Sequence, residues 1–442
     1  MPTLALSMIV RNAEKHIREC LESVRGMVDE IHVADTGSTD STFRIASETG
    51  ARVISIPWEN DFAKARNRAL QEVHTDWVLV LDADELLDPG ACQYLPGLID
   101  HPRVMGYLTP IRNYVLSPRD RVWDQPSVPN HGRFEPAKGY PAYVEHQNVR
   151  LFRRSPEIFF IGRVHETVGT SIESSGGELR PCPILIHHFG LAADPDTQAR
   201  KNHLYREMGR QKLLEMPENA QAHFELGLVE FDNFHNYEEA LRLFCRACEL
   251  NSRLAVSWFF AGMAYLKLGR PEEALNCLKS AGARPTVCEA QGDALYALGQ
   301  FDHARRAYQR AFEGAKLPAD LESKIGLAEV RSGRVKKGVA KLRQAVLRDP
   351  SEPQLHDRLV TALVWLGHMA EAAEAAEKKI ATVKSDPQAY LRAAVIRAQQ
   401  QDWQQSWELL RRGLAQFPHH PALEGVLAEV LPRILEPTAC TK

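Results

Sequence analysis

The chain has 442 residues, of which 44% are hydrophobic and 25% charged, a balance typical of globular proteins that bury a sizeable core. Lysine and arginine together number 54 and aspartate and glutamate 57, which gives a formal net charge of −3. A nearly neutral chain has no overall attraction to nucleic acid or to an anionic membrane, which argues against a general DNA- or RNA-binding protein.

The first apolar run, Leu4–Val10, is a strand candidate. It is far shorter than the roughly 18 residues of a membrane span, as are all other apolar runs, and no basic segment precedes it as in a signal peptide. The eight cysteines suggest no disulfide framework, and Cys245 and Cys248 lack the further ligands of a zinc site. We therefore expect a protein of the reducing cytoplasm without an integral membrane segment.

Up to about residue 105, strand candidates alternate with helical patterns. The further strand candidates are Glu30–Ala34, Ala51–Pro57 and Trp77–Leu81. The helical patterns cover Ile17–Val24, Phe43–Gly50 and Ala63–Val73. Strands that alternate with helices predict crossover connections, and so an α/β domain with a mainly parallel sheet.

Between about residues 105 and 190, short strand candidates lie among long polar loops. These candidates are Tyr107–Ile111, Val149–Phe152, Ile158–Ile161 and Ile184–His187. The longest loop, residues 117–148, is rich in proline, arginine and aromatic residues. Because long loops in compact domains are often functional, we interpret this one as a lid over an acceptor site, with a plain surface insertion as the alternative.

From about residue 215 onward, the pattern is helical and repeats with a period of 34 residues in all but one interval. Small residues recur inside every second helix at Ala240, Ala274, Ala304, Gly338, Ala372 and Ser406. Helices approach closely only where side chains are small, and each helix pair must stack on its neighbour to bury its apolar face. The period and the small residues match the tetratricopeptide repeat. We expect an N-terminal domain over residues 1–215, about six repeats over 216–420, and a capping helix and tail over 421–442.

Acidic residues follow two strands of the predicted sheet. Asp35 follows Glu30–Ala34, and Asp82 and Asp84 follow the buried strand Trp77–Leu81. In open α/β sheets ligands bind beyond the carboxyl ends of the strands. Two carboxylates at alternate positions can hold Mg²⁺ or Mn²⁺, which would neutralise a diphosphate, although such aspartates can also be simple helix caps. Arg66, on the preceding helix, adds a cation where a nucleotide could be recognised.

Four segments occur in order, namely Leu6–Asn12, Asp35–Asp40, Trp58–Asn67 and Leu81–Glu85. They cover residues 4–87 closely, and Arg150–Arg153, Gly162–Glu166 and His187–Gly190 extend the match to about residue 190. This set resembles the family 2 glycosyltransferases. More narrowly, it resembles the bacterial branch in which such a domain precedes tetratricopeptide repeats, a branch that includes the sublancin-type S-glycosyltransferases.

The resemblance implies a GT-A fold, which is Rossmann-like, and an inverting transfer of a hexosyl group from a nucleotide-diphosphate sugar, most often a UDP-sugar. By position, Asp35 would accept a hydrogen bond from the base, and Asp82 would lie near the ribose and the metal. Asp84 would be the main protein ligand of that metal. Arg66 would face the nucleotide or its diphosphate.

The resemblance also directs attention to residues late in the domain. A late histidine can complete the metal shell in GT-A folds, and His188 is the candidate, with a hydrogen-bonded core or loop histidine as the alternative; imidazole suits Mn²⁺ better than Mg²⁺. An inverting transfer needs a base that deprotonates the acceptor. Glu166 is the first candidate, with an ion pair to an arginine as its alternative role. Asp61 and Glu85 are the other candidate bases.

Two classes of function fit these features. The first is an active glycosyltransferase whose repeats recruit a peptide or protein acceptor in a concave groove. The second is an interaction scaffold with a degenerate enzyme domain. The complete set of Asp35, Asp82 and Asp84 favours the enzyme. Within that class a cell-envelope saccharide or a lipid-linked precursor is the alternative acceptor, and the lack of a membrane anchor in the sequence favours the peptide or protein.

Overall fold

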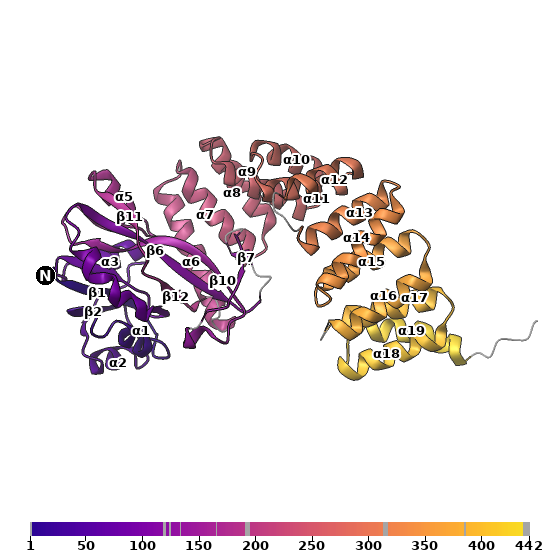
Figure 1. The fold of residues 1–442 in the computed structure, drawn as a ribbon, viewed down its shortest axis with the longest axis horizontal. Coiled ribbons are helices and arrows are strands. Elements are labelled where there is room, and N and C mark those ends of the chain that lie inside the picture. Colours follow the sequence, from indigo (N-terminus) through magenta and orange to yellow (C-terminus); the bar gives the residue numbers. More distant parts are fainter. Residues whose placement is uncertain are drawn as a thin grey trace, which may run out of the picture. The chain divides into compact units, whose positions relative to one another are not determined.

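The computed structural model describes residues 2–117, 121–122, 125–132, 134–164, 166–190, 195–312, 317–383 and 386–435 (Figure 1). By packing, the chain divides into two compact units, residues 1–234 and 235–442. Part of the predicted lid, at residues 118–120, 123–124 and 133, lies outside the described residues. Among the residues that are described, no helix combines the length and the apolar character needed to cross a bilayer.

Unit 1 begins with a parallel sheet that agrees closely with the predicted elements. Its strands are β1 (Leu4–Val10), β2 (Glu30–Asp35), β3 (Arg52–Ser55) and β4 (Trp77–Val80), paired in parallel in the order β3-β2-β1-β4. The connecting helices are α1 (Ile17–Ser23), α2 (Thr42–Glu48) and α3 (Phe62–Leu70). Each crossover is a helix with one apolar face, as the sequence pattern predicts, so the α/β class of this domain is confirmed.

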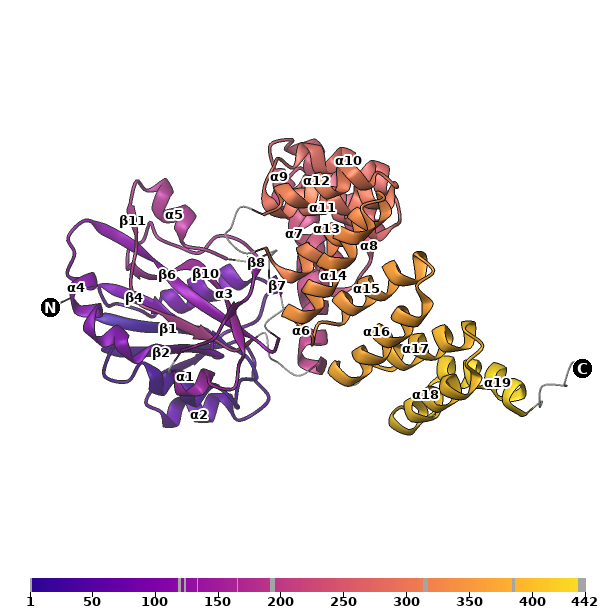
Figure 2. The same cartoon turned by 45° about the vertical axis from the view of Figure 1, so that its right-hand side comes forward.

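The second half of the sheet contains antiparallel pairs. Its strands are β5 (Glu85–Leu87), β6 (Val104–Val115), β9 (Val128–Pro129), β10 (Ala142–Arg153), β11 (Glu178–Pro181) and β12 (Ile186–His188). Strand β10 pairs antiparallel with both β4 and β6 (Figure 2). Strand β12 pairs in parallel with β6. Two antiparallel steps restore the original direction, so β12 runs in the same sense as β4.

The remaining elements of unit 1 are short, apart from one helix. They are η1 (Pro89–Gln93), α4 (Leu95–Ile99), β7 (Arg121–Val122), β8 (Gln125–Pro126), η2 (Glu135–Ala137), α5 (Gly169–Ser174), α6 (Pro195–Glu215), α7 (Ala220–Leu228) and η4 (Val229–Asn233). The sequence pattern predicted neither α5 nor α6. The predicted strand Ile158–Ile161 is wrong, because of this segment only Ile161 pairs, in an isolated bridge to Thr167.

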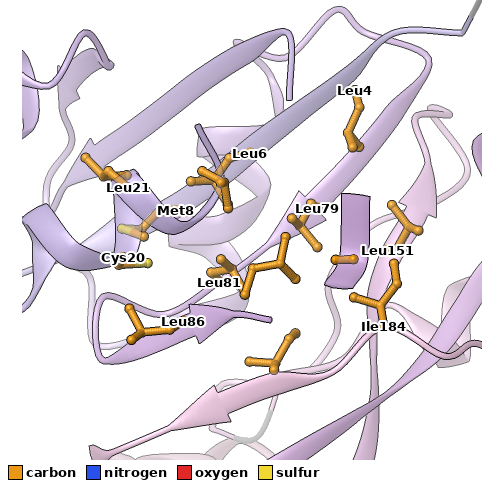
Figure 3. Packing of buried hydrophobic residues seen from close by; sticks show 14 of the residues in the cluster. Leu4, Leu6, Met8, Cys20, Leu21, Leu79, Leu81, Leu86, Leu151 and Ile184 are labelled. Atoms are coloured by element: carbon orange, nitrogen blue, oxygen red, sulfur yellow. The ribbon is translucent and has the colours of Figure 1, made fainter. Parts of the chain in front are cut away.

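The core of unit 1 fixes where the strands end. Leu4, Leu6 and Met8 of β1 are fully buried and pack with Leu79 of β4 and with Leu21 of α1 (Figure 3). Full burial of a side chain of this size contributes roughly 1.5–3 kcal/mol. A slip of one residue would turn these large side chains to the opposite face of the sheet, where the smaller Ala5 and Ser7 are buried. The register is therefore strongly specified, and the acidic residues after β2 and β4 are held at one sheet edge.

Unit 2 consists of stacked helix pairs. Its helices are α8 (Tyr237–Leu250), α9 (Ala255–Lys267), α10 (Pro271–Ser280), α11 (Pro285–Ala297), α12 (Phe301–Arg310), α13 (Ala319–Arg331), α14 (Val335–Arg348), α15 (Pro353–Trp365), α16 (Met369–Thr382), α17 (Pro387–Gln399), α18 (Trp403–Gln416) and α19 (Pro421–Leu435). The six predicted small residues are buried in the even-numbered helices from α8 to α18. The interval of 30 residues arises because α10 has 10 residues where α14 has 14.

Successive repeats in unit 2 are joined by a ladder of charges. Three cations spaced by 34 residues lie on α13, α15 and α17, and each donates hydrogen bonds to the first helix of the preceding pair. The pairs are Lys324 with Glu289 and Asp293, Arg358 with Asp320 and Ser323, and Arg392 with Asp357 and Thr361. The stacking of neighbours therefore has a polar component beside the buried alanines.

The turn within a helix pair requires a left-handed residue. Gly269, Gly299, Gly333 and Gly367 have φ of +70°, +73°, +86° and +75°, and Gln401, which lies 34 residues after Gly367, has φ of +62°. A side chain in this conformation costs about 1 kcal/mol, which glycine avoids.

We expect Gln401→Gly to raise the free energy of unfolding by about 0.5–1 kcal/mol and Gly333→Ala to lower it by a similar amount, as measured by urea denaturation. A destabilised Gln401→Gly variant would contradict this account of the turn.

Candidate active site

Three strands bring the candidate residues to one edge of the sheet. Asp35 is the last residue of β2, Asp82 and Asp84 follow β4, and His188 is the last residue of β12. Because β2, β4 and β12 run in the same direction, their carboxyl ends meet at the same edge, where ligands bind in open α/β sheets. Residues that are far apart in the sequence thus converge on one place.

Asp35 has one carboxylate oxygen in use and one without a partner. Its Oδ1 accepts hydrogen bonds from the backbone N–H groups of Gly37 and Ser38, each at 2.7 Å. Its Oδ2 is buried and has no hydrogen-bond partner among the described residues. A buried polar atom without a partner costs about 1–3 kcal/mol, so this oxygen is suited to accept a hydrogen bond from a ligand.

Two arginines bind the carboxylates of Asp82, Glu85 and Glu166. Arg66 donates from Nε to Glu166 Oε1 and from Nη2 to Asp82 Oδ1, both at 2.6 Å. Arg150 donates from Nη2 to Asp82 Oδ2 at 3.0 Å and to Glu85 Oε1 at 2.7 Å. We call these five residues the two-arginine cluster. It binds Asp82 through both carboxylate oxygens, so the side chain is held in one orientation.

Burial and charge oppose each other in the two-arginine cluster. Burial alone would lower the pKa of Arg66, but attraction to Asp82 and Glu166 outweighs it and raises that pKa. Burial alone would raise the pKa of Asp82, but the two arginines lower it well below its usual range. Burial raises the pKa of Glu85 to about 7, with Arg150 opposing the rise and Asp82 adding to it. Asp82 therefore stays ionised near neutral pH.

Asp84, which follows β4, and His188, at the end of β12, form a pair. His188 Nε2 lies 3.7 Å from Asp84 Oδ1, and His188 Nδ1 lies 2.7 Å from Asn113 Oδ1. With the Nδ1–H donated to Asn113, Nε2 is directed at Asp84. Burial would lower the pKa of His188, but the interaction with Asp84 outweighs it and raises that pKa. A side chain at Gly190 would clash with Asp84 Oδ2 and His188 Nε2, so a glycine keeps this space open.

The neighbouring histidine has a different environment. His187 Nδ1 lies 2.8 Å from the Tyr114 hydroxyl and its Nε2 lies 3.0 Å from Asp88 Oδ2, so both ring nitrogens have protein partners. Of the two histidines, His188 is the one whose ring nitrogen lies near Asp84. Within the described ranges, no group of three or more His, Cys, Asp or Glu side chains is suited to a metal ion, so Asp84 and His188 would be the protein's contribution to one.

The three candidate bases differ in their surroundings. Glu166 is 14% exposed at its side chain and forms an ion pair with Arg66, which is the alternative role expected from the sequence. Asp61 caps α3 by accepting a hydrogen bond from the backbone N–H of Lys64. Glu85 is buried and bonded to Arg150 and to the backbone N–H of Asp82, so it lacks access to an acceptor. Glu166 stays the first candidate, and its role as the base stays a prediction.

Sequence reasoning gave no role to several residues that the fold places here. Arg150 and Gly190 lie in segments that carried the family resemblance, so the sequence contained a signal for them. Asn113, inside β6, carried none. Lys201 lies on α6, which was not predicted, and its Nζ lies 3.7 Å from Asp84 Oδ2. Arg66 is bound to two carboxylates in the structure. Its contact with a nucleotide stays a prediction.

Comparisons with known proteins agree with this fold. Residues 6–159 match the model of glycosyl transferase family 2, and residues 255–281 and 289–353 match models of the tetratricopeptide repeat. A TPR repeat-containing protein of Synechococcus elongatus is 31% identical over 62% of this chain and 59% of its own length. The SPbeta prophage-derived glycosyltransferase SunS of Bacillus subtilis is 28% identical over 37% of this chain and 34% of its own.

A third relative, an uncharacterized glycosyltransferase of Rickettsia typhi, is 38% identical over 20% of this chain and 30% of its own length. The chain therefore spans less than two thirds of each of these relatives. Unit 1 contains a family 2 glycosyltransferase domain, and tetratricopeptide repeats follow it, as the sequence predicts. Glu166, His188 and α6 lie beyond the part of unit 1 that matches the family model.

Proposed function

We propose that this protein is an inverting, metal-dependent glycosyltransferase that transfers a hexosyl group from a UDP-sugar to a peptide or protein acceptor recruited by the repeats. One observation carries the proposal. A family 2 glycosyltransferase domain presents, at a single sheet edge, a buried Asp35 oxygen without a partner and the pair of Asp84 and His188. A cytoplasmic location stays a prediction.

Asp35 would recognise the base of the donor. Uracil presents an imide N–H, and the unpartnered Oδ2 of Asp35 is a charged acceptor for such a group. The other oxygen, held by Gly37 and Ser38, fixes the orientation of the carboxylate. The two-arginine cluster fixes Asp82 in the same way, so the donor would meet side chains that are already in place.

Asp84 and His188 fit a divalent metal ion. A histidine that binds a metal usually donates its other ring N–H to an acceptor, and His188 does so to Asn113. The space in front of Nε2 is kept open by Gly190. A carboxylate and an imidazole favour Mn²⁺ over Mg²⁺. When bound, the metal would neutralise charge on the diphosphate.

Glu166 would take the proton from the acceptor. Inversion requires the acceptor oxygen or sulfur to attack the anomeric carbon from the side opposite the diphosphate, while its proton passes to a base. Arg66 would orient Glu166 through the Nε–Oε1 hydrogen bond. The tetratricopeptide repeats support a peptide or protein acceptor, because stacked helix pairs present an extended concave surface.

The test is stabilisation of the purified protein by UDP and Mn²⁺. At ten times the dissociation constant, a ligand adds about 1.4 kcal/mol to the free energy of unfolding. We expect this gain to require Mn²⁺, to vanish in Asp84→Ala, and to persist in Glu19→Ala, which removes an exposed carboxylate from α1. If GDP, CDP or dTDP replaces UDP, only the base assignment fails. No response to any of the four nucleotides would favour the scaffold.

A further inference from the structure

We propose that Lys201 is a residue of the donor site with two alternating partners: it binds Asp84 when the site is empty and the donor diphosphate when metal and donor are bound. This inference rests on the proposed function. It adds α6, which lies beyond the family match, to the binding site for the leaving group.

The ammonium of Lys201 lies near the carboxylate of Asp84. Its Nζ is 3.7 Å from Asp84 Oδ2, while His188 Nε2 is 3.7 Å from Oδ1 of the same carboxylate. One carboxylate is thus shared between the histidine that would bind the metal and a lysine from another element. A metal ion at Asp84 would repel the ammonium and displace it from the carboxylate.

Lys201 is more exposed and has fewer ion-pair partners than the arginines of the two-arginine cluster. Arg66 and Arg150 are buried and each is bound to two carboxylates, so releasing either would leave charges without partners. Lys201 is 42% exposed at its side chain, and Asp84 is its single ion-pair partner within the described part of the chain. Asp84 is less exposed, at 23% of its side chain, and the long flexible stem of lysine lets the charge shift to a new partner.

Tyr205 shows that this face of α6 is directed at the site. It lies four residues after Lys201, on the same side of the helix. Its ring is 6.3 Å from that of Phe62, between centroids. Burial raises the pKa of Tyr205 to about 12, and the charges of Asp82, Glu166 and Asp84 add to the rise. The face of α6 that carries Lys201 therefore lies next to Phe62 of α3 and reaches Asp84 through Lys201 itself.

The two partners of Lys201 have opposite consequences for binding. For the free protein, the ammonium competes with the metal for Asp84, so its removal strengthens metal binding. For the metal-loaded protein, the ammonium attracts the diphosphate, so its removal weakens nucleotide binding. A residue that merely supported the fold would change both affinities in the same direction or neither.

The experiment compares Lys201→Met with Arg210→Met, which removes a half-exposed cation further along α6 whose carboxylate partners are Glu207 and Glu230. Mn²⁺ binding to the free protein is measured by electron paramagnetic resonance, and UDP binding at saturating Mn²⁺ by calorimetry. We expect Lys201→Met to bind Mn²⁺ about threefold to fivefold more tightly and UDP about tenfold more weakly. Arg210→Met should leave both close to wild type, and Lys201→Arg should recover most of the UDP affinity.

Weaker binding of both ligands by Lys201→Met, or no change in either, overturns the assignment while the proposed function stands on the wild-type affinities. Failure of the wild-type protein to bind Mn²⁺ and UDP rejects the proposed function and this inference with it. The outcomes therefore separate an error about Lys201 from an error about the site.

Discussion

Arg66→Met is expected to lower the free energy of unfolding by about 3 kcal/mol, because it leaves two carboxylates without their shared cation. Glu166 would lose its arginine in a setting where its side chain is 14% exposed. Asp82 would keep Arg150 and is more exposed, which places the effect at the lower end of the range for broken buried ion pairs. Methionine keeps much of the apolar contact with Phe160, over whose ring the guanidinium lies at 5.5 Å.

The control for this variant lies on the same helix. Lys64 is exposed and its Nζ is 3.5 Å from Glu59, so Lys64→Met should change the stability by less than about 1 kcal/mol. Urea denaturation of both variants measures the difference. Equal stabilities of the two would mean that the two-arginine cluster contributes little to folding. Its tight hydrogen bonds would then serve only to orient Asp82 and Glu166.

Asp35→Asn is expected to weaken UDP binding by about tenfold to a hundredfold, which corresponds to a charge-assisted hydrogen bond of about 1.5–3 kcal/mol. The amide oxygen can still accept hydrogen bonds from Gly37 and Ser38, so the turn is kept. The amide NH₂ would take the place of Oδ2 and would face the imide N–H of uracil, donor against donor. Calorimetry with UDP at saturating Mn²⁺ measures the loss.

Two further ligands identify the source of that loss. Inorganic pyrophosphate lacks a base, so its affinity should be the same in Asp35→Asn and the wild type. CDP should lose less affinity than UDP, because the ring nitrogen of cytosine is an acceptor that the new amide can meet. An equal loss for pyrophosphate would show that the substitution disturbs the whole site, and the role of Asp35 in base recognition would then be rejected.

The sequence predicts the part of the site that depends on local pattern. Strand β2 ends in Asp35 and the apolar strand β4 is followed closely by Asp82 and Asp84, and the rule for parallel sheets then places these aspartates at one edge. The repeats are equally visible, because a small residue must recur wherever neighbouring helices touch. Both inferences need only residue type and spacing along the chain.

The rest depends on contacts between distant segments. The bond from Arg66 to Glu166 joins residues 100 positions apart, and no periodicity marks it. In Ile158–Ile161, buried and exposed side chains alternate as in a strand, but Ile158 and Phe160 pack on the core without a neighbouring strand to pair with. Helix α6 carries few apolar residues along its 21 positions, so its pattern gave little indication of a helix that approaches Asp84.

The ladder of charges in unit 2 bears on how the number of repeats can change. Each rung joins a cation of one repeat to acceptors of the repeat before it, and the repeats of α13, α15 and α17 each supply such a cation at the same position. The repeats of α13 and α15 also carry the acceptors that the next cation needs. A unit of 34 residues could therefore be duplicated or lost there without leaving either charge unmatched, so the polar contacts between neighbours are inherited with the unit itself.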